Sequence, residues 1–273
     1  MINYASKYST LVDERFTLGS LTSGLVNNNF EWLGVETVNV YSIPTSTMND
    51  YNLTGSNRYG TPEELQNEVQ ELKVTRDRSF TFTIDRKSHD DTMMAMEAGK
   101  ALKRQINEVV IPEIDAYRLA AIVAGAKDGN VVTKATTKAN AYEEFLAVQE
   151  ILDNGKAPQG GRVCVVSPAF LNKIKLDESF TKKGDMATEM AINGLVGEID
   201  GVPCIKVPSS YLPTGVDFVI TNAECTPSPV KLQDYKIHED APGISGWLVE
   251  GRVRYDAFVL DQKKVAIGVH KAE

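Results

Sequence analysis

The sequence predicts an α+β fold, and three stretches carry this prediction. Residues 69–86 alternate between apolar and polar side chains, and they do so over more residues than an ordinary strand contains. Residues 91–126 repeat apolar side chains at three- and four-residue steps, which is the period of a helix. Residues 139–225 alternate between helical patterns and short apolar runs, which indicates a compact α/β lobe.

The first third of the chain predicts extended structure. The N-terminal stretch is polar and has no clear period, so we expect an arm that becomes ordered only against another surface. Residues 35–43 are rich in β-branched side chains and predict a strand that ends at Pro44. A turn-rich segment, residues 45–60, follows. Thr61-Pro62-Glu63-Glu64 then predicts a short helix, with an N-cap, a proline at the first helical position and a capping-box glutamate.

The alternation in residues 69–86 predicts one strand of roughly 55 Å with a single apolar face. Arg76 and Arg78 interrupt the apolar row at its middle. Phe80, Phe82 and Ile84 can lie at the root of a protruding, hairpin-like arm, against the body of the domain, whereas Leu72 and Val74 lie farther out and need another surface. We therefore expect a neighbouring chain to cover them; a sheet inside one large domain is the alternative. The apolar row consists of Leu72, Val74, Phe80, Phe82 and Ile84.

The long helical pattern contains Pro112, which should kink or interrupt the helix. The lobe that follows predicts a helix from residue 139, a short apolar strand in RVCVVSP that is buried on both faces, and a helix opened by Ser167 and Pro168. It also predicts a strand that starts at residues 201–203 and a third strand at 216–222. The C-terminal stretch returns to β alternation. It predicts a strand whose apolar face runs from Trp247 to Val259, a turn at residues 261–264, and a last strand that pairs back on the first.

Composition excludes several classes of protein. The chain has 273 residues and a formal net charge of −8, which makes it a poor general binder of nucleic-acid phosphate. No apolar run approaches the length of a membrane helix, and the N-terminus has no signal-peptide pattern. The three cysteines are scattered, so we expect reduced thiols in an intracellular protein and no disulfide framework.

The motifs of common enzymes are missing. The sequence contains no phosphate-binding glycine loop, no nucleophile elbow and no zinc-binding pattern. His89, His238 and His270 share no ligand spacing, and Asp90-Asp91 is more simply explained as a helix start favoured by the dipole. We therefore predict no enzyme, no catalytic residue, no cofactor and no metal.

The order of these elements resembles the major capsid proteins of tailed phages, the Hong Kong 97-type fold that encapsulins share. YGTPEELQNEVQELKVTRDRSFTFTID resembles the extended loop of capsid proteins from phages and prophages of Gram-positive bacteria, and NEVVIPEIDAYRLAAI resembles their spine helix. GEIDGVPCIKVPSSYLP resembles the strand entry of the axial domain, and GRVRYDAFVLDQKKVAIGVH resembles the closing strands. The match covers nearly the whole chain.

The resemblance implies a role for each segment. Residues 1–34 would be the N-terminal arm and 35–86 the extended loop that lies over a neighbour. Residues 87–137 and 226–273 would form the peripheral domain with the spine helix and the long C-terminal strands. Residues 138–225 would be the axial domain.

The same resemblance implies a shell. The chain would assemble as hexamers and pentamers into an icosahedral capsid around double-stranded DNA, without sequence-specific DNA contacts and without a membrane. Its other partners would be a separate scaffolding protein, a portal and, as an option, a decoration protein. The protein would be found in the virion capsid and would assemble in the cytoplasm of the bacterial host.

The predicted functional residues are contacts between subunits rather than a catalytic site. Charged residues of the long strand would set the register across the interface more than they add affinity. Relatives that crosslink their subunits use a lysine and an asparagine, but residues 45–60 contain no lysine, so we expect no such crosslink. An encapsulin-type nanocompartment and a phage tail or other structural β-protein remain the alternatives. The predicted contacts are Arg58, Tyr59, Glu71, Leu72, Val74, Arg76, Asp77 and Arg78.

Overall fold

The computed structural model describes residues 20–27, 37–86, 97–177, 196–239 and 241–273. The chain divides into two units, of which the smaller is Trp32–Lys73 and the larger contains the rest. The start of the predicted long helix, residues 90–96, and His89 lie outside the described residues.

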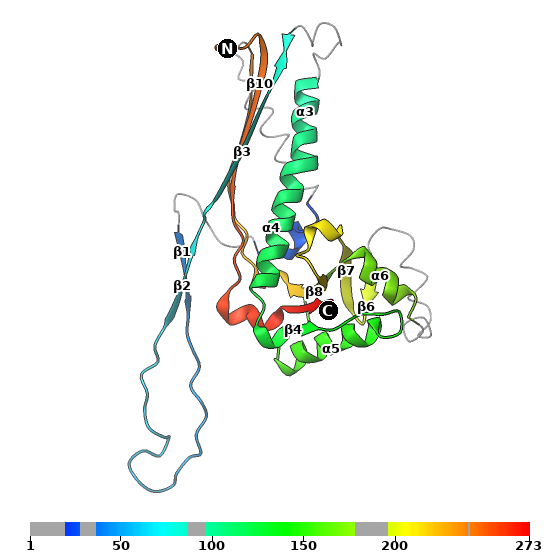
Figure 1. Cartoon of the computed structure of the whole chain (residues 1–273). Helices are drawn as coiled ribbons and strands as arrows, with labels where there is room; N and C mark the ends of the chain where they lie inside the picture. The colour runs from blue at the N-terminus through cyan, green and yellow to red at the C-terminus, as the bar shows by residue number, and fades with distance from the viewer. Residues whose placement is uncertain (1–19, 28–36, 87–96, 178–195, 240) are drawn as a thin grey trace. The chain divides into compact units, whose positions relative to one another are not determined.

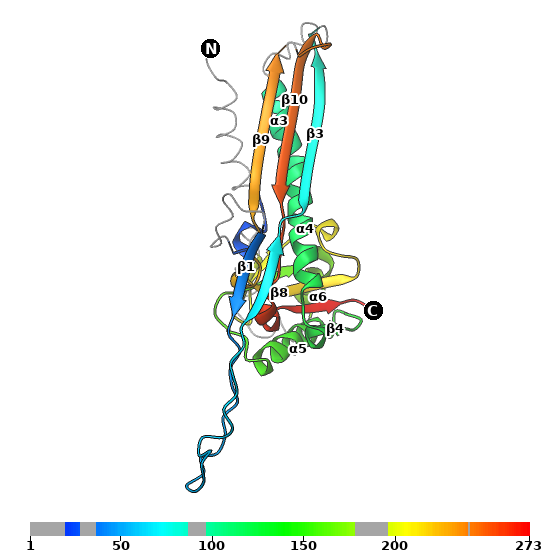
Figure 2. The same ribbon diagram turned by 90° about the vertical axis from the view of Figure 1, so that its left-hand side faces the viewer.

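A three-stranded antiparallel sheet forms one part of the larger unit. It consists of β3 (Arg76–Asp85), β10 (Gly246–Tyr255) and β9 (Val230–Glu239), in the order β3-β10-β9. Figure 2 shows the three strands side by side. In β10, Val249, Val253 and Tyr255 are buried while Glu250 and Arg252 are exposed, which confirms the predicted alternation in this part of the chain.

A long helix runs along this sheet (Figures 1 and 2). It consists of α3 (Glu97–Gln105), a π-helical stretch (Ile106–Val110) and α4 (Ile111–Ala124). Pro112 lies in the first turn of α4. Because proline lacks an N–H and its ring collides with the carbonyl four residues back, the helix needs a wider turn just before it, which the π-helical stretch provides. The predicted interruption is therefore confirmed, and it takes the form of a π-helical stretch.

The apolar faces of helix and sheet form one hydrophobic core. Phe80 and Phe82 of β3 pack against it, as the sequence predicted for these residues at the root of the arm. Because this core is built from strands and helix of one chain, β3 does not need a neighbour to cover its apolar face. The buried members of this core include Leu102, Ile106, Val110, Ile114, Tyr235, Val249, Val253 and Tyr255.

The second part of the larger unit is a six-stranded mixed sheet. Helix α5 (Ala141–Asn154) contacts β11, and α6 (Pro168–Lys175) contacts β8. The strands, in spatial order, are β4 (Val131–Thr133), β11 (Gly268–Lys271), β8 (Val216–Asn222), β5 (Arg162–Val166), β7 (Val202–Lys206) and β6 (Val196–Ile199). Short 3₁₀ turns lie at Ser23–Leu25, Asp128–Asn130, Ser209–Tyr211, Ala223–Cys225 and Asp261–Ala266.

Most of this lobe follows the sequence prediction. Every residue of β8 is buried, and β5 is buried nearly throughout, as expected for apolar strands at the centre of a sheet. Ser167 caps α6 by accepting a hydrogen bond from the Phe170 N–H at 3.3 Å. The last strand is different from the prediction. β11 pairs with β8 and β4 rather than with β10, because the 3₁₀ turn after Leu260 leads the chain into the second sheet, where β11 is buried.

The N-terminal segment 20–27 packs on its own chain. The Ser20 and Thr22 hydroxyls each donate to the buried Asp115 carboxylate at 2.5 Å, and Leu25 is fully buried. Asn27 pairs with Pro227 in an isolated bridge. For these eight residues, the other surface that the sequence analysis expected is supplied by the same chain. Residues 1–19 of the predicted N-terminal arm lie outside the described part of the chain.

The smaller unit is an antiparallel pair of strands, β1 (Thr37–Ser42) and β2 (Glu68–Lys73), joined by a long irregular loop. We call residues 37–73 the arm. The strand predicted from residues 35–43 is confirmed over β1. The helix predicted at Thr61 is absent: residues 61–67 are exposed and non-helical. Capping residues cannot offset the cost of nucleating a single turn when no apolar face is buried.

The long strand predicted at 69–86 is two strands. β2 ends at Lys73 and β3 begins at Arg76, and the two pair with different partners in different units. Leu72 and Val74 are 2% and 1% exposed, so the expectation that they need cover from a neighbouring chain is wrong. Our four-part division of the sequence stays a prediction.

Candidate assembly site at the start of β3

The buried carboxylate of Asp256 fixes the chain just before β3. Its Oδ2 accepts hydrogen bonds from the Thr75 N–H at 2.8 Å and from the Thr75 hydroxyl at 3.0 Å. Its Oδ1 accepts from the Tyr117 hydroxyl at 2.7 Å and from the Ala257 N–H at 2.9 Å. Asp256 is only 3% exposed, and these four donors compensate for its lost hydration. The carboxylate thus ties the entry of β3 to α4 and to the end of β10.

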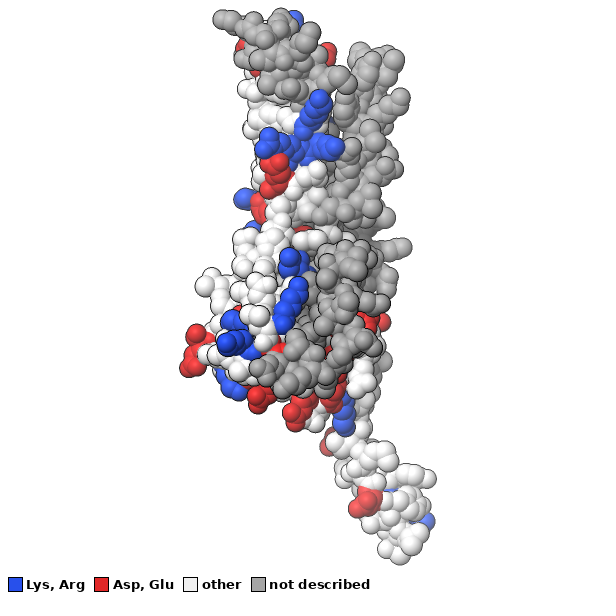
Figure 3. Space-filling model, turned by 90° about the vertical axis from the view of Figure 1, so that its right-hand side faces the viewer, with Lys and Arg blue, Asp and Glu red and all other residues white. Residues whose placement is uncertain are grey.

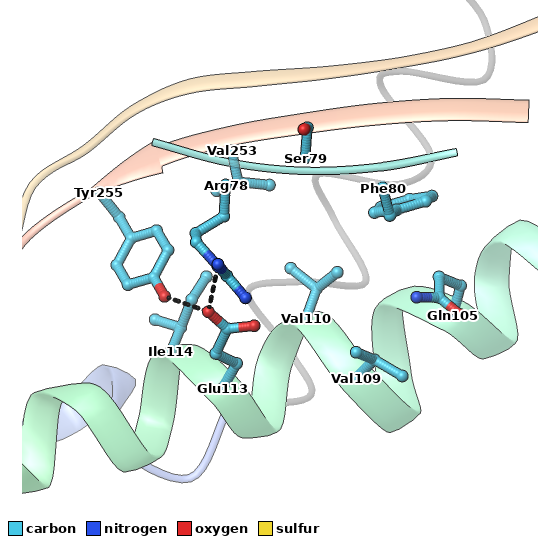
Figure 4. A pocket seen from close by; sticks show the side chains of 10 residues that line it. All are labelled: Arg78, Ser79, Phe80, Gln105, Val109, Val110, Glu113, Ile114, Val253 and Tyr255. Atoms are coloured by element: carbon cyan, nitrogen blue, oxygen red, sulfur yellow. Dashed lines mark hydrogen bonds and ion pairs between the residues drawn. The ribbon is translucent and has the colours of Figure 1, made fainter. Parts of the chain in front are cut away.

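A second carboxylate, that of Glu113 on α4, holds the first residues of β3 (Figure 4). Its Oε1 accepts a hydrogen bond from the Arg78 Nε at 2.8 Å and from the Tyr255 hydroxyl at 3.1 Å. The Arg76 guanidinium lies 3.9 Å from the same oxygen. Glu113, Arg78 and Tyr255 border a pocket of about 120 Å³ between the sheet and the helix. Its other walls are Ser79, Phe80, Gln105, Val109, Val110, Ile114 and Val253.

Arg76 also stacks on an aromatic ring. Its guanidinium carbon lies 4.5 Å from the centre of the Tyr117 ring, and the ring of Tyr117 meets that of Tyr255 edge-on at 5.6 Å. Burial and the hydrogen bond to Asp256 raise the pKa of Tyr117 to about 12. Burial likewise raises the pKa of Tyr255. Both phenols are therefore neutral donors at physiological pH, which is the state that the two carboxylates require.

On the exposed face of the sheet, the start of β3 carries a separate ion pair. Arg252 of β10 donates two hydrogen bonds to Asp77, from Nε at 2.9 Å and from Nη2 at 2.5 Å. These hydrogen bonds lower the pKa of Asp77. Arg254 donates to the Val74 carbonyl at 3.1 Å. Residues 74–78 are therefore held on both faces of the sheet.

The predicted contact residues fall into three groups. Arg76, Asp77 and Arg78 come together at the site, each with a partner in its own chain. Leu72 and Val74 are buried. The remaining three, Arg58, Tyr59 and Glu71, lie exposed on the arm. There Arg58 donates to the Gly55 carbonyl at 3.3 Å, and the rings of Tyr51 and Tyr59 meet edge-on at 5.0 Å.

Sequence reasoning missed the partners that hold the strand. Asp256 lies one residue past β10, where the alternation of the strand no longer applies, so its parity gives no sign that it is buried. Glu113 follows Pro112 and carried no signal beyond its place near a helix start. Tyr117 and Tyr255 are far apart in the sequence, and their rings come into contact only because the helix packs on the sheet.

The described residues also bear on metal binding and thiol chemistry. Among the described residues, no group of three His, Cys, Asp or Glu side chains could hold a metal ion. The three cysteines are free thiols and all are buried, and burial raises the pKa of Cys164 and Cys225. No helix in the described ranges is long and apolar enough to cross a membrane. The arrangement serves to hold a strand.

The family comparison decides what kind of protein this is. The family model described as phage capsid protein matches residues 68–268, which is most of the chain and includes the site just described. The chain belongs to the phage capsid protein family. No curated protein matches it.

Solved structures show that this capsid protein has the Hong Kong 97-type fold. A chain from Mycobacterium phage Che8 is 15% identical, with a TM-score of 0.68, 90% of this chain covered and 89% of that one. The capsid structure of cyanophage P-SCSP1u is 13% identical, with a TM-score of 0.65 and coverages of 88% and 84%. A virus-like particle from Pyrococcus furiosus is 12% identical, with a TM-score of 0.60 and coverages of 99% and 100%.

Family and fold together identify a structural major capsid protein of a tailed phage, which assembles into shells of identical subunits and is found in the virion capsid. They do not favour the encapsulin alternative, and they argue against an enzyme.

Proposed function

We propose that this capsid protein forms an icosahedral shell of hexamers and pentamers around the double-stranded DNA of a tailed phage or prophage, and that its arm lies on a neighbouring copy. The observation that carries the proposal is the exposed apolar surface of the arm. Of the eleven exposed large hydrophobic side chains among the described residues, eight belong to residues 37–73. They are Tyr41, Ile43, Met48, Tyr51, Leu53, Tyr59, Leu65 and Val69.

An arm of this kind needs a partner to be stable. Two strands by themselves are marginal in water, and the arm is one pair of strands with a long loop. Exposed apolar patches of this kind mark surfaces where proteins associate. In a shell, the partner that is present at every position is another copy of the same chain.

The site at the start of β3 supports this role. The hydrogen bonds to Thr75 and Arg78 fix the chain directly after the arm ends at Lys73. We propose that Arg76, Asp77 and Arg78 contribute to assembly by holding this start, while Arg58, Tyr59 and Glu71 contact the neighbour. Reversing the charge of Arg76 or Arg78 should impair assembly and leave the subunit folded.

Electron microscopy of the purified, concentrated protein tests the proposal. We expect closed shells from the full chain and none from a variant in which residues 44–66 are replaced by two glycines. That deletion keeps both arm strands, and circular dichroism should show that the variant is folded. Normal shells from the deletion variant, or only single subunits from the full chain at high concentration, would contradict the proposal.

The remaining partners are proposals of the same kind. We propose a separate scaffolding protein, a portal, an optional decoration protein and packaged DNA that is held without sequence-specific contacts, with assembly in the cytoplasm of the host. Particles purified from infected cells should contain nuclease-protected DNA; a cargo enzyme in its place would favour a nanocompartment. Their subunits should run as monomers on denaturing gels, because residues 45–60 contain no lysine.

A further inference from the structure

Helix α4 carries a buried acid and a buried base three residues apart. Asp115 is 1% exposed and Arg118 is 4% exposed, whereas charged side chains generally lie at the surface, as Figure 3 shows for one face of the molecule. The Asp115 Oδ1 and the Arg118 Nη1 are 3.9 Å apart. Burial lowers the pKa of Arg118, yet a guanidinium stays charged in proteins. Both groups therefore need further hydrogen-bond partners from the chain around them.

The described N-terminal segment supplies these partners. The hydroxyls of Ser20 and Thr22 each donate to the Asp115 carboxylate at 2.5 Å, and the Leu21 N–H donates to it at 2.9 Å. The same two hydroxyls accept hydrogen bonds from the Arg118 Nη1, at 3.4 Å and 3.2 Å respectively. The hydroxyls thus lie between the acid and the base, and the two charges in turn fix the N-terminal segment on α4.

The Nε of the same guanidinium leads toward the start of β3. It donates to the Ser228 hydroxyl at 2.9 Å, and that hydroxyl donates to the main-chain carbonyl of Asp256 at 2.9 Å. The carboxylate of Asp256 accepts from the Thr75 N–H at 2.8 Å and, on its other oxygen, from the Tyr117 hydroxyl at 2.7 Å. Asp256 is therefore held at its main chain through Arg118 and at its side chain by Tyr117, and both residues belong to α4.

These contacts hold the chain on both sides of the arm. The N-terminal segment precedes the arm in the sequence, Thr75 follows it by two residues, and both anchors belong to the larger unit. The groups that connect the anchors, Asp115, Arg118, Ser228 and Asp256, are all less than 5% exposed. Because water does not reach them, a hydrogen bond lost at one group is not replaced by solvent, and the next group must shift.

We propose that Asp115 and Arg118 are positioning residues for the arm, because they act through Ser228 and Asp256 to connect the attachment of the N-terminal segment to the start of β3. Release of the segment loosens the point where the arm joins the larger unit. The inference rests on the proposed function only in its consequence: an arm with a loose start meets a neighbouring copy in many orientations and assembles more slowly. The connection itself is a property of the single subunit, so its test needs no shell.

Hydrogen exchange at the Thr75 amide of the unassembled full chain, measured by NMR relative to the amides of β8, tests the connection. Thr22→Val removes one hydroxyl and should speed this exchange at least about fivefold, the equivalent of one hydrogen bond of ~1 kcal/mol. Thr22→Ser keeps the hydroxyl and should exchange like wild type. Ser20→Ala removes the other hydroxyl and should act in the same direction, which provides a second variant if Thr22→Val does not fold. Thr136→Val is the matched control, because that hydroxyl donates to the buried Asp217 at 2.7 Å in the other lobe; it should leave the ratio unchanged.

The serine in the middle shows whether the effect follows this route. Ser228→Ala removes the hydroxyl between Arg118 and Asp256, so it should by itself speed exchange at Thr75. In the Ser228→Ala chain, Thr22→Val should then add less than about twofold, because the connection is already broken. The proposal is overturned if the substitutions at Ser20 and Thr22 leave the ratio unchanged, or if the effects of Thr22→Val and Ser228→Ala simply multiply. Absence of shells from the wild-type chain would contradict the proposed function and leave this result as it stands.

Discussion

Replacing Asp256 with alanine should be the most damaging single change at the start of β3. The carboxylate accepts four hydrogen bonds, from the Thr75 N–H and hydroxyl, the Tyr117 hydroxyl and the Ala257 N–H. Alanine leaves all four donors without this acceptor. The change also releases the point where the chain leaves the arm and enters β3.

The size of the effect follows from burial. Hydrogen bonds to a charged group contribute about 1.5–3 kcal/mol each, but donors that regain water recover much of this. Thr75 is exposed and Tyr117 is half-buried, so water replaces most of what they lose, whereas the Ala257 N–H stays buried. We expect a loss of about 2–4 kcal/mol in the free energy of unfolding. For a unit of this size that lowers the melting temperature by about 5–15 °C.

Urea unfolding of the unassembled subunit, followed by circular dichroism, measures this loss. Asp256→Asn keeps one acceptor oxygen and should lose about half as much. Asp234→Ala is the control, because its partner Lys236 lies 2.8 Å away in an exposed pair that contributes less than about 1 kcal/mol. Trypsin should also cut Asp256→Ala faster after Lys73 and Arg76. If Asp256→Ala unfolds at the same urea concentration as Asp234→Ala, the argument from the four donors is refuted.

Three further changes test other parts of the larger unit. Gly251→Ala places a methyl group into the rings of Phe80 and Tyr235 and should cost about 1–3 kcal/mol in calorimetry; Gly129→Ala, which meets no neighbouring atom, should not. The pKa of Tyr117 is raised to about 12, so its contribution to stability is complete below pH 10 and is lost as the pH rises toward 12; Tyr117→Phe should lack this loss in alkaline unfolding curves. Burial acts to raise the pKa of Asp217, but the nearby His270 ring, whose Nδ1 lies 3.6 Å away, the hydrogen bond from Thr136 and the charge of Lys173 outweigh it and lower the pKa from its ordinary value. The contribution of Asp217 is therefore present above its ordinary pKa and lost in acid, so the stability difference between wild type and Asp217→Asn should shrink as the pH falls below about 4; a constant difference would contradict the assignment.

Local patterns in the sequence determined the elements whose burial follows a simple period. The alternation in β10 and the apolar runs of β5 and β8 placed these strands correctly, because a strand with one or two buried faces must carry that pattern. The Ser167 cap and the interruption at Pro112 were also predictable, since both depend on a few adjacent residues. The capsid fold was predicted from the order of these elements, because that order resembles the one in tailed-phage capsid proteins.

Tertiary structure decided where strands end and what they pair with. Residues 69–86 keep one parity throughout, so the sequence gives no sign that the chain breaks at Thr75; the break exists because the distant Asp256 takes the Thr75 N–H. The capping signals at Thr61 describe a good helix start, but no buried face is available there and the helix does not form. Strand β11 joins the six-stranded sheet because that sheet offers β8 and β4 as partners, a choice that no local pattern records. Periodicity reports which face of an element is buried, whereas the partner on that face depends on residues far away in the chain.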